Sequence, residues 1–182
     1  MSLRARSFVG PMLAASAMSL VASAASGDRA LPREGAPLFS ISKSENRNQV
    51  AFAVRLDAEC RPVGSAPVYA FWRMLERSPA AVEPLLPVEQ GAYGIARQEV
   101  AELGDSSLVR VALRALPGRE ILVRTARQPT GCSAEASTRI ADTPARLFNV
   151  HARIAWPFGV DSLLISGWAE SDGRVVRETM RP

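Results

Sequence analysis

The chain has 182 residues, 47% of them hydrophobic and 22% charged, and its formal charge is +4. This composition and length are typical of one globular domain with a core of its own. Lys43 is the single lysine, and the arginines are spread along the chain among Glu and Asp. A nucleic-acid-binding protein gathers its cations in one stripe, so we expect no nucleic-acid partner.

The N-terminal segment has the pattern of a secretory signal peptide. Residues 1–7 carry Arg4 and Arg6 and no acid, residues 8–21 are apolar or small, and Ala22-Ser23-Ala24 is a small-x-small cleavage sequence. The apolar span is shorter than the roughly 20 residues of a permanent transmembrane helix. We therefore predict a signal peptide over residues 1–24, a periplasmic or secreted protein, and no permanent membrane span. The alternative is a disordered apolar tail.

Residues 25–36 are small, charged or turn-forming, which predicts a flexible lead-in to a β domain over residues 37–182. Three strands are expected first, at residues 38–42, 49–57 and 67–75. The second alternates cleanly, with Val50, Phe52, Val54 and Leu56 on one face. A turn over residues 44–48 joins the first two strands, because Ser and Asn side chains hydrogen-bond nearby backbone.

The middle of the chain is less regular. Residues 76–87 hold three prolines, which excludes a continuous strand or a long helix. A short helical turn is expected over residues 88–92, and residues 95–103 suit either a strand or a short helix. The best hairpin joins residues 108–116 to residues 120–127 through Pro117-Gly118.

Further strands are expected at residues 133–140, 146–156, 160–169 and 174–180. In the second of these, Phe148 is expected on the face of Val150, Ile154 and Trp156, with Leu147 on the opposite face. Short strands ended by Gly, Pro, Asp or Ser, without a long helical period, are typical of all-β domains. The sequence therefore predicts a single-domain antiparallel barrel or sandwich of about eight to ten short strands, with at most one or two short helical turns.

The two cysteines, Cys60 and Cys132, lie in separate turn-like segments and form no C-x-x-C pair. In an oxidising compartment they can close one disulfide across a long loop, which stabilises the fold by about 4 to 5 kcal/mol in the chain-entropy model. The alternative is two unpaired thiols in separate loops, since sequence does not show bridge geometry.

Several short patterns resemble a family of bacterial envelope proteins, the domain-of-unknown-function 4833 family. The residues that carry the likeness are Lys43, Ser44, Asn46 and Asn48; Pro67, Val68 and Trp72; Ala92, Tyr93 and Gly94; and Gly167, Gly173 and Glu178. The likeness covers nearly all of the chain after residue 24. It departs at Lys43, where an arginine is expected, and at Ala53, where an aromatic is expected. The resemblance implies a fold and an envelope location, and it assigns no catalytic residue.

The sequence contains little that indicates catalysis. The single histidine, His151, falls in the middle of a predicted strand. At such a position a partly exposed structural histidine is more common than a catalytic base. One histidine and two distant cysteines do not make a zinc site. Carboxylate pairs, dinucleotide-binding loops and phosphate loops are not found in the sequence. We predict no catalytic residues, no metal and no cofactor.

The main candidate site is a polar group formed by Lys43, Ser44, Asn46, Asn48, Arg73 and Tyr93. If the sheet closes, these side chains gather at one rim, where amides and a cation hold a carbonyl- or carboxylate-bearing ligand. The alternative is that the asparagines serve turn geometry alone. Trp72, Trp156 and Trp168 either line an apolar interior or belong to the core.

From these patterns we expect an exported binding or structural module of the bacterial periplasm that acts without a cofactor on an unknown small molecule or envelope protein. One alternative is an envelope enzyme, which requires Lys43, Asn46, Arg73 and Tyr93 to converge in one pocket. Another is a partner-binding protein that offers an edge strand or an apolar patch.

Overall fold

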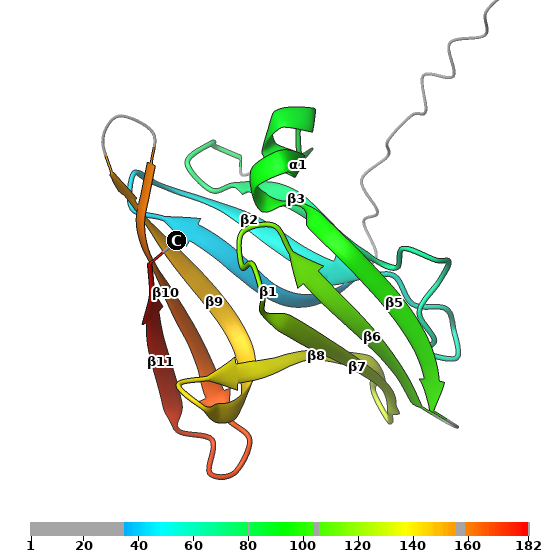
Figure 1. The fold of residues 1–182 in the computed structure, drawn as a ribbon. Helices are drawn as coiled ribbons and strands as arrows, with labels where there is room; N and C mark the ends of the chain where they lie inside the picture. The colour runs from blue at the N-terminus through cyan, green and yellow to red at the C-terminus, as the bar shows by residue number, and fades with distance from the viewer. Residues whose placement is uncertain (1–34, 80, 104–105, 156–158, 182) are drawn as a thin grey trace, which may run out of the picture.

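A computed structural model of the chain describes residues 35–79, 81–103, 106–155 and 159–181. The predicted signal peptide (1–24), most of the lead-in, Trp156 and residues 104–105 and 157–158 lie outside the described residues. The fold is all-β, as predicted, with one short helix and, within the described part, eleven strands (Figure 1). The elements are β1 (Ala36–Lys43), β2 (Asn46–Val54), β3 (Val68–Met74), β4 (Ala81–Pro84), α1 (Pro87–Tyr93), β5 (Ile95–Leu103), β6 (Ser106–Leu113), β7 (Glu120–Gln128), β8 (Gly131–Ile140), β9 (Thr143–Ala155), β10 (Gly159–Ala169) and β11 (Val175–Met180).

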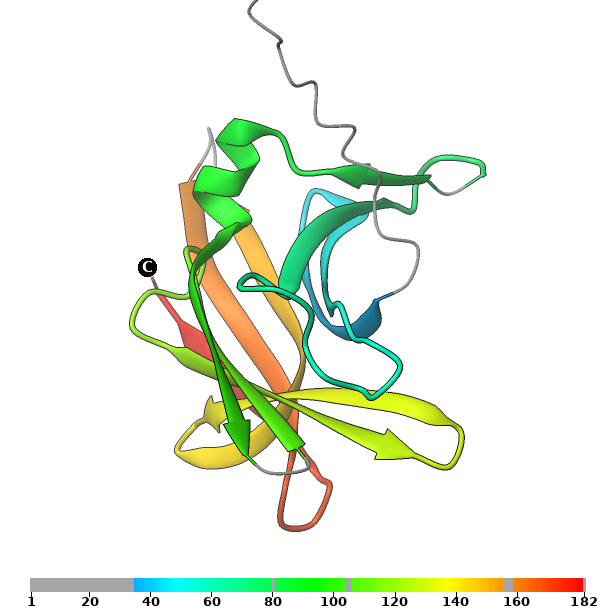
Figure 2. The ribbon, with the colours of Figure 1, turned by 90° about the vertical axis from the view of Figure 1, so that its right-hand side faces the viewer.

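The strands form one sheet that forks at β9. The strand order is β4-β3-β2-β1-β9-β8-β7-β6-β5, and β10 and β11 branch from β9. One edge of β9 pairs with β8 near its start and with β1 further along, while its other edge pairs with β10. Strands β1 to β4 form one wing of the sheet, and strands β5 to β8 form the other. The two wings leave β9 and curl toward each other as a half-barrel (Figure 2).

The pairing of β1 with β9 is parallel, whereas the sequence analysis expected an antiparallel sheet throughout. Every other described strand pair is antiparallel. The exception arises because β1 is the first strand of one wing and joins β9 across more than a hundred residues. Turn signals between neighbouring strands carry no information about such a pair.

The core lies between the two wings. Phe52 of β2 stacks on Phe39 of β1 with ring centroids 4.5 Å apart, and Val109, Val111 and Ile121 face them from the other wing. Fully burying an aliphatic or aromatic side chain of this size contributes about 1.5–3 kcal/mol. The residues predicted on one face of β2, Val50, Phe52 and Val54, are all buried in this cluster. Ala51 and Ala53 are buried too, so this part of β2 is covered on both faces and is not half-buried as expected.

The middle of the chain differs from the prediction in one element. β4 is a short strand inside the proline-rich segment 76–87, where no strand was expected. Pro84 is tolerated because β4 is an edge strand, which needs hydrogen bonds on one side only. The short helical turn is confirmed by α1, and residues 95–103 form a strand. Among the described residues, no helix has the length and apolarity needed to cross a membrane.

The predicted faces of β9 are wrong at Phe148 and Leu147. Leu147 is buried in the core, whereas Phe148 packs against Trp168 outside it, with ring centroids 4.2 Å apart. The cause is a bulge: Leu147 pairs with Gly167 and Asn149 with Ser166, which leaves Phe148 as the extra residue. A bulge inserts one residue and reverses the face of everything on one side of it, which a simple alternation does not reveal.

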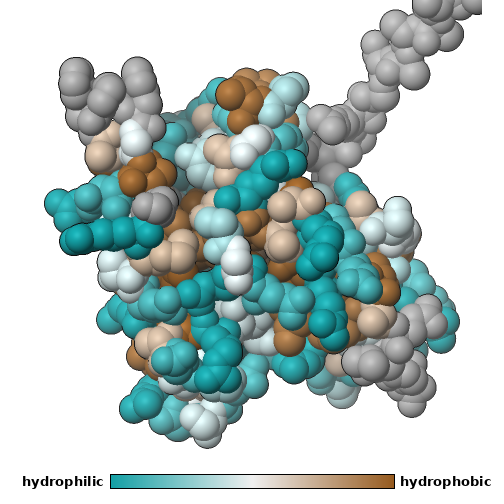
Figure 3. All heavy atoms as spheres, in the orientation of Figure 1, coloured by the Kyte–Doolittle hydropathy of each residue, from teal (hydrophilic) through white to brown (hydrophobic). Residues whose placement is uncertain are grey.

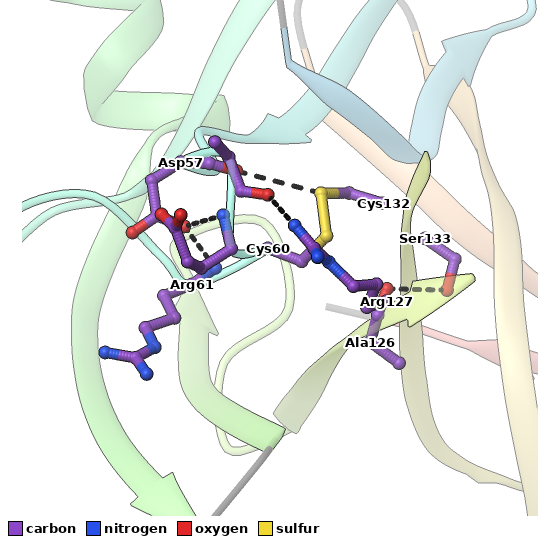
Figure 4. Close-up of a disulfide and its surroundings, with 9 residues drawn as sticks. Asp57, Cys60, Arg61, Ala126, Arg127, Cys132 and Ser133 are labelled. Atoms are coloured by element: carbon purple, nitrogen blue, oxygen red, sulfur yellow. Dashed lines mark hydrogen bonds between the residues drawn. A yellow bond between two sulfur atoms is a disulfide. The ribbon is translucent and has the colours of Figure 1, made fainter. Parts of the chain in front are cut away.

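Cys60 and Cys132 form a disulfide, which resolves the alternative left open by the sequence (Figure 4). Their Cα atoms are 5.2 Å apart, and the bond joins the β2–β3 connection to the start of β8 across 72 residues of sequence. Beside it, Arg127 donates a hydrogen bond from Nη2 to the carbonyl oxygen of Ala58 at 2.5 Å. The long β2–β3 connection is therefore fastened to the opposite wing.

Candidate functional site

A hollow of about 330 Å³ lies where the β1–β2 hairpin meets β3, β4 and the start of α1. We call it the rim pocket. Three kinds of side chain line it: a cation and an amide, apolar groups, and carboxylates. The lining residues are Lys43, Asn48, Trp72, Met74, Glu83, Pro84, Leu86 and Glu89. A pocket of this size falls at the lower end of the roughly 300–1,000 Å³ typical of small-molecule sites.

The centre of the rim pocket is a contact between Lys43 and Trp72. Lys43 ends β1, and its Nζ lies 5.4 Å from the centroid of the Trp72 ring. Tyr93, the last residue of α1, meets the same indole edge-on at 5.8 Å. A cation over an aromatic face contributes about 0.5–1 kcal/mol at exposed sites. The three side chains thus form one aromatic and cationic wall.

The indole N–H of Trp72 is an unsatisfied donor. Trp72 is only 8% exposed, and its Nε1 has no hydrogen-bond partner within the described part of the chain. A buried donor without a partner costs about 1–3 kcal/mol, and each such group in a native structure asks for an explanation.

One carboxylate pairs with Lys43, and two others line the rim pocket. Glu45 Oε2 lies 3.9 Å from Lys43 Nζ, Glu83 pairs with Arg77, and Glu89 accepts a hydrogen bond from the Leu86 amide at 2.7 Å. Burial raises the pKa of Tyr93 above its ordinary value, and the negative charges of Glu45 and Glu89 raise it further. Tyr93 therefore keeps its proton and remains a hydrogen-bond donor at neutral pH.

Three of the predicted site residues accept hydrogen bonds from the backbone, and only Asn46 does so within its own turn. Ser44 accepts a hydrogen bond from the Ile154 amide at 3.1 Å, and Asn46 accepts one from the Asn48 amide at 3.1 Å. Asn48 accepts one from the Glu76 amide at 3.2 Å and also lines the rim pocket. Asn46 thus stabilises its own turn, whereas Ser44 joins that turn to β9. Both therefore have structural partners of their own.

Arg73 does not join the group. Trp72 is buried and Arg73 is exposed, because successive residues of a strand point to opposite faces. The structure thus brings Lys43, Asn48 and Tyr93 together around Trp72 and leaves Arg73 on the far side of β3. The envelope-enzyme alternative requires Lys43, Asn46, Arg73 and Tyr93 to converge in one pocket, and Arg73 does not join the others.

Glu83 and Glu89 were not anticipated as site residues. They lie in β4 and α1, in and just after the proline-rich segment, whose path over the end of the half-barrel is not visible in the sequence. A signal was available for Glu89 only, since an acid in the first turn of a short helix beginning with a proline is typical of a helix N-terminus. That signal predicts a helix start and does not predict a pocket.

His151 lies beside Ser42 on the outer face of the parallel β1–β9 pair. The Ser42 Oγ is 3.0 Å from His151 Nδ1, and Asn149 donates from Nδ2 to the same oxygen at 3.2 Å. The side chains are half-buried and form a polar ladder along the two strands. In the described residues, no three His, Cys, Asp or Glu side chains are grouped so as to hold a metal ion.

The tryptophans do not share one interior. Trp72 is at the edge of the core, whereas Trp168 is 37% exposed on the outer side of β10. Trp156 lies outside the described residues.

Fold and site together define a small all-β domain, a half-barrel with a mixed cationic, aromatic and acidic pocket at its rim. The family model described as Domain of unknown function (DUF4833) matches residues 39–179, and the chain belongs to this family. The resemblance drawn from the sequence is thereby confirmed. No curated protein and no solved structure gives a significant match to the chain.

Proposed function

We propose that this protein is an exported, non-catalytic binding module of the bacterial periplasm whose rim pocket holds a small zwitterionic ligand. The observation that carries the proposal is the contact of Lys43 with Trp72 in the lining of the rim pocket. A ligand carboxylate beside Lys43 pairs with the cation, and the Trp72 ring packs against the ligand.

The carboxylates of the rim pocket suit the other end of the ligand. Glu83 and Glu89 line the pocket together with Lys43, and a ligand ammonium group between them gains charge-assisted hydrogen bonds. Met74 and Pro84 supply apolar wall for a short side chain. An amino acid or a dipeptide with free termini carries this combination of groups.

Export is supported by the signal-peptide pattern of residues 1–24 and by the Cys60–Cys132 disulfide. Structural disulfides persist in oxidising compartments such as the periplasm and are rare in the cytosol. The test is the mass of the protein purified from the periplasmic fraction of its own cells. A chain that begins at Ala25 supports the proposal, and a chain that retains residues 1–24 in the cytosol contradicts it.

Ligand binding is tested by calorimetric titration with alanyl-alanine, its N-acetyl form and its C-terminal amide. We expect the unmodified dipeptide to bind about tenfold or more tightly than either blocked form, because each block removes one charge-assisted contact. Lys43→Gln should weaken binding by a similar factor. Arg73→Gln, on the opposite face of β3, is the matched control and should leave binding unchanged. The proposal is contradicted if all three dipeptides bind equally tightly, or if none of them binds.

A second candidate function is the docking of a protein partner on α1 and β4. No residue of α1, all of which is described, is buried, and Val82, Leu86 and Val88 are 52%, 59% and 78% exposed. Hydrophobic side chains gather over α1 at the top of Figure 3. Exposed apolar groups beside an edge strand are typical of interaction surfaces. Loss of a co-purifying periplasmic protein in Val88→Glu, but not in Val160→Glu, would support this function.

A further inference from the structure

A second and larger hollow lies at the other end of the molecule. It measures about 730 Å³ and lies between the outer face of β7 and β8, the β8–β9 turn and the β10–β11 hairpin. A smaller hollow of about 320 Å³ adjoins it and ends at Trp168. The two share Arg124, Ser137 and Glu170 as walls, so we treat them together as the polar groove.

One end of the polar groove is fixed by an ion pair. Arg119 donates from Nη2 to Glu178 Oε1 at 2.6 Å, and the Ala141 amide donates to Glu178 Oε2 at 2.8 Å. Glu178 belongs to β11 and Ala141 to the β8–β9 turn, so this pair holds the hairpin against the opposite wall. The groove is therefore pre-formed, which lowers the entropy cost of binding.

The charges of the polar groove nearly cancel. Its described walls carry four guanidinium groups, from Arg119, Arg124, Arg139 and Arg146. They carry five carboxylates, from Glu120, Glu135, Asp142, Glu170 and Glu178. The polar groove therefore has a formal charge of about −1, which does not attract a polyanion. Many donors and acceptors with little net charge suit a neutral ligand rich in hydroxyl groups, since each hydroxyl both donates and accepts.

The adjoining end of the polar groove carries an aromatic platform. Trp168 is 37% exposed and lies against Phe148 with ring centroids 4.2 Å apart and ring planes tilted by 37°. The Arg146 guanidinium lies over the indole, 4.8 Å from its centroid. Glu135 holds that guanidinium through a 2.8 Å bond to Arg146 Nη1. The bulge at Phe148 is what turns this aromatic ring outward to support the indole. The part of the indole that Phe148 and Arg146 leave exposed lies beside polar walls and offers an apolar surface to the C–H groups of a sugar ring.

We propose that the polar groove binds a neutral oligosaccharide, with Trp168 as the stacking surface and Arg124 and Glu170 as hydrogen-bonding walls. Nine of the fifteen residues that line its larger hollow are charged or carry a hydroxyl group, and the other six supply apolar wall. Arg124 and Glu170 lie 3.7 Å apart at the junction of the two hollows, within reach of neighbouring hydroxyls on one sugar. This site is separate from the rim pocket and does not depend on its ligand.

The test is calorimetric titration of the chain from residue 25 with chitotriose, cellotriose and maltotriose as neutral probes, and a heparin tetrasaccharide as an anionic probe. We expect saturable binding of at least one neutral trisaccharide and weaker binding of the sulfated chain. Trp168→Ala should weaken binding about tenfold, since a stacked aromatic contributes roughly a decade of affinity. Arg124→Gln should weaken it about threefold or more.

Two control variants separate this site from other effects. Arg153→Gln removes an arginine that is 75% exposed and pairs with Asp161 at 3.9 Å, outside the polar groove, and should leave sugar binding unchanged. Lys43→Gln should also leave it unchanged. The proposal is overturned by the absence of saturable binding to every neutral probe, by wild-type affinity in Trp168→Ala and Arg124→Gln, or by tighter binding of the heparin tetrasaccharide.

Discussion

The side-chain amide of Gln98 pairs with the backbone of Val68. The Val68 amide donates to Gln98 Oε1 at 2.9 Å, and Gln98 Nε2 donates to the Val68 carbonyl at 3.0 Å. β4 covers only Phe71 to Met74 of β3, so the first part of that edge has no strand beside it. Gln98 belongs to β5, at the end of the other wing, and its amide takes the place of a neighbouring strand. It thereby links the two free edges of the half-barrel.

Gln98→Ala tests this link. The change leaves the buried Val68 amide and carbonyl without these partners, so we expect the free energy of unfolding to fall by about 1–3 kcal/mol. Urea denaturation followed by circular dichroism measures the loss. Gln128→Ala, at the exposed end of β7, is the control and should change stability by less than about 0.5 kcal/mol. Equal losses in the two variants would show that Gln98 does not close the half-barrel.

The disulfide should contribute substantially to stability. Replacing Cys60 and Cys132 by serine removes a cross-link between positions 72 residues apart, which stabilises by about 4–5 kcal/mol in the chain-entropy model. Urea denaturation with and without dithiothreitol should show this loss in the wild type. The double variant should not respond to the reductant. A wild-type midpoint that dithiothreitol does not move would contradict the prediction.

Glu178 should make stability depend on pH. Burial raises the pKa of Glu178, but the hydrogen bonds from the Ala141 amide and Arg119, with the charge of Arg119, outweigh it and leave the pKa below the ordinary value of 4.5. A lowered folded-state pKa stabilises the fold above the unfolded-state value, and this contribution is lost as the pH falls through the folded-state pKa. Glu178→Gln should therefore cost about 1 kcal/mol at neutral pH and progressively less below about pH 4.5.

Urea denaturation of wild type and Glu178→Gln at several pH values checks this dependence. Glu170→Gln, whose carboxylate is 45% exposed beside Arg124, serves as the control and should show little effect at any pH. A difference between Glu178→Gln and wild type that stays constant from neutral to acid pH would exclude the ion pair as its source.

Gly167 should be required opposite the β9 bulge. A Cβ at Gly167 would lie 2.7 Å from both the Arg146 carbonyl oxygen and Ile140 Cδ1, so the backbone must shift. We expect Gly167→Ala to lower the free energy of unfolding by about 1–3 kcal/mol. Gly159→Ala is the matched control in the same strand, since a Cβ there meets only Ala155 Cβ at 4.0 Å. Thermal unfolding compares the Gly167→Ala and Gly159→Ala variants. Equal stability of the two variants would show that the bulge does not require a glycine at position 167.

Much of the fold could be predicted because strand faces are a local property. The alternation of Val50, Phe52 and Val54 predicted a strand with these residues on one buried face, and Pro117-Gly118 predicted the hairpin of β6 and β7. The same alternation, applied to β3, already places Trp72 and Arg73 on opposite faces. It fails at Phe148, because the extra residue of the bulge is defined by the pairing of Leu147 with Gly167 on another strand.

The candidate site could be predicted only in part. Lys43, Asn48 and Tyr93 were expected at one rim, and they lie around Trp72. The acids of the rim pocket and the whole polar groove were not foreseen, because their walls come from strands that meet through the fork at β9. Export, the ligands and the partner remain predictions that the experiments above address.

The sequence by itself determined the all-β class, the positions of most strands and turns, and the family, because backbone sterics, two-residue alternation and turn chemistry act between near neighbours. Tertiary structure alone decided the parallel pairing of β1 with β9, the contact of Ser42 with His151, the Cys60–Cys132 bond and the bridge from Gln98 to Val68. Each of these joins residues at least thirty positions apart. Such contacts depend on how the wings curl around one core, and that arrangement minimises exposed apolar surface over the whole chain.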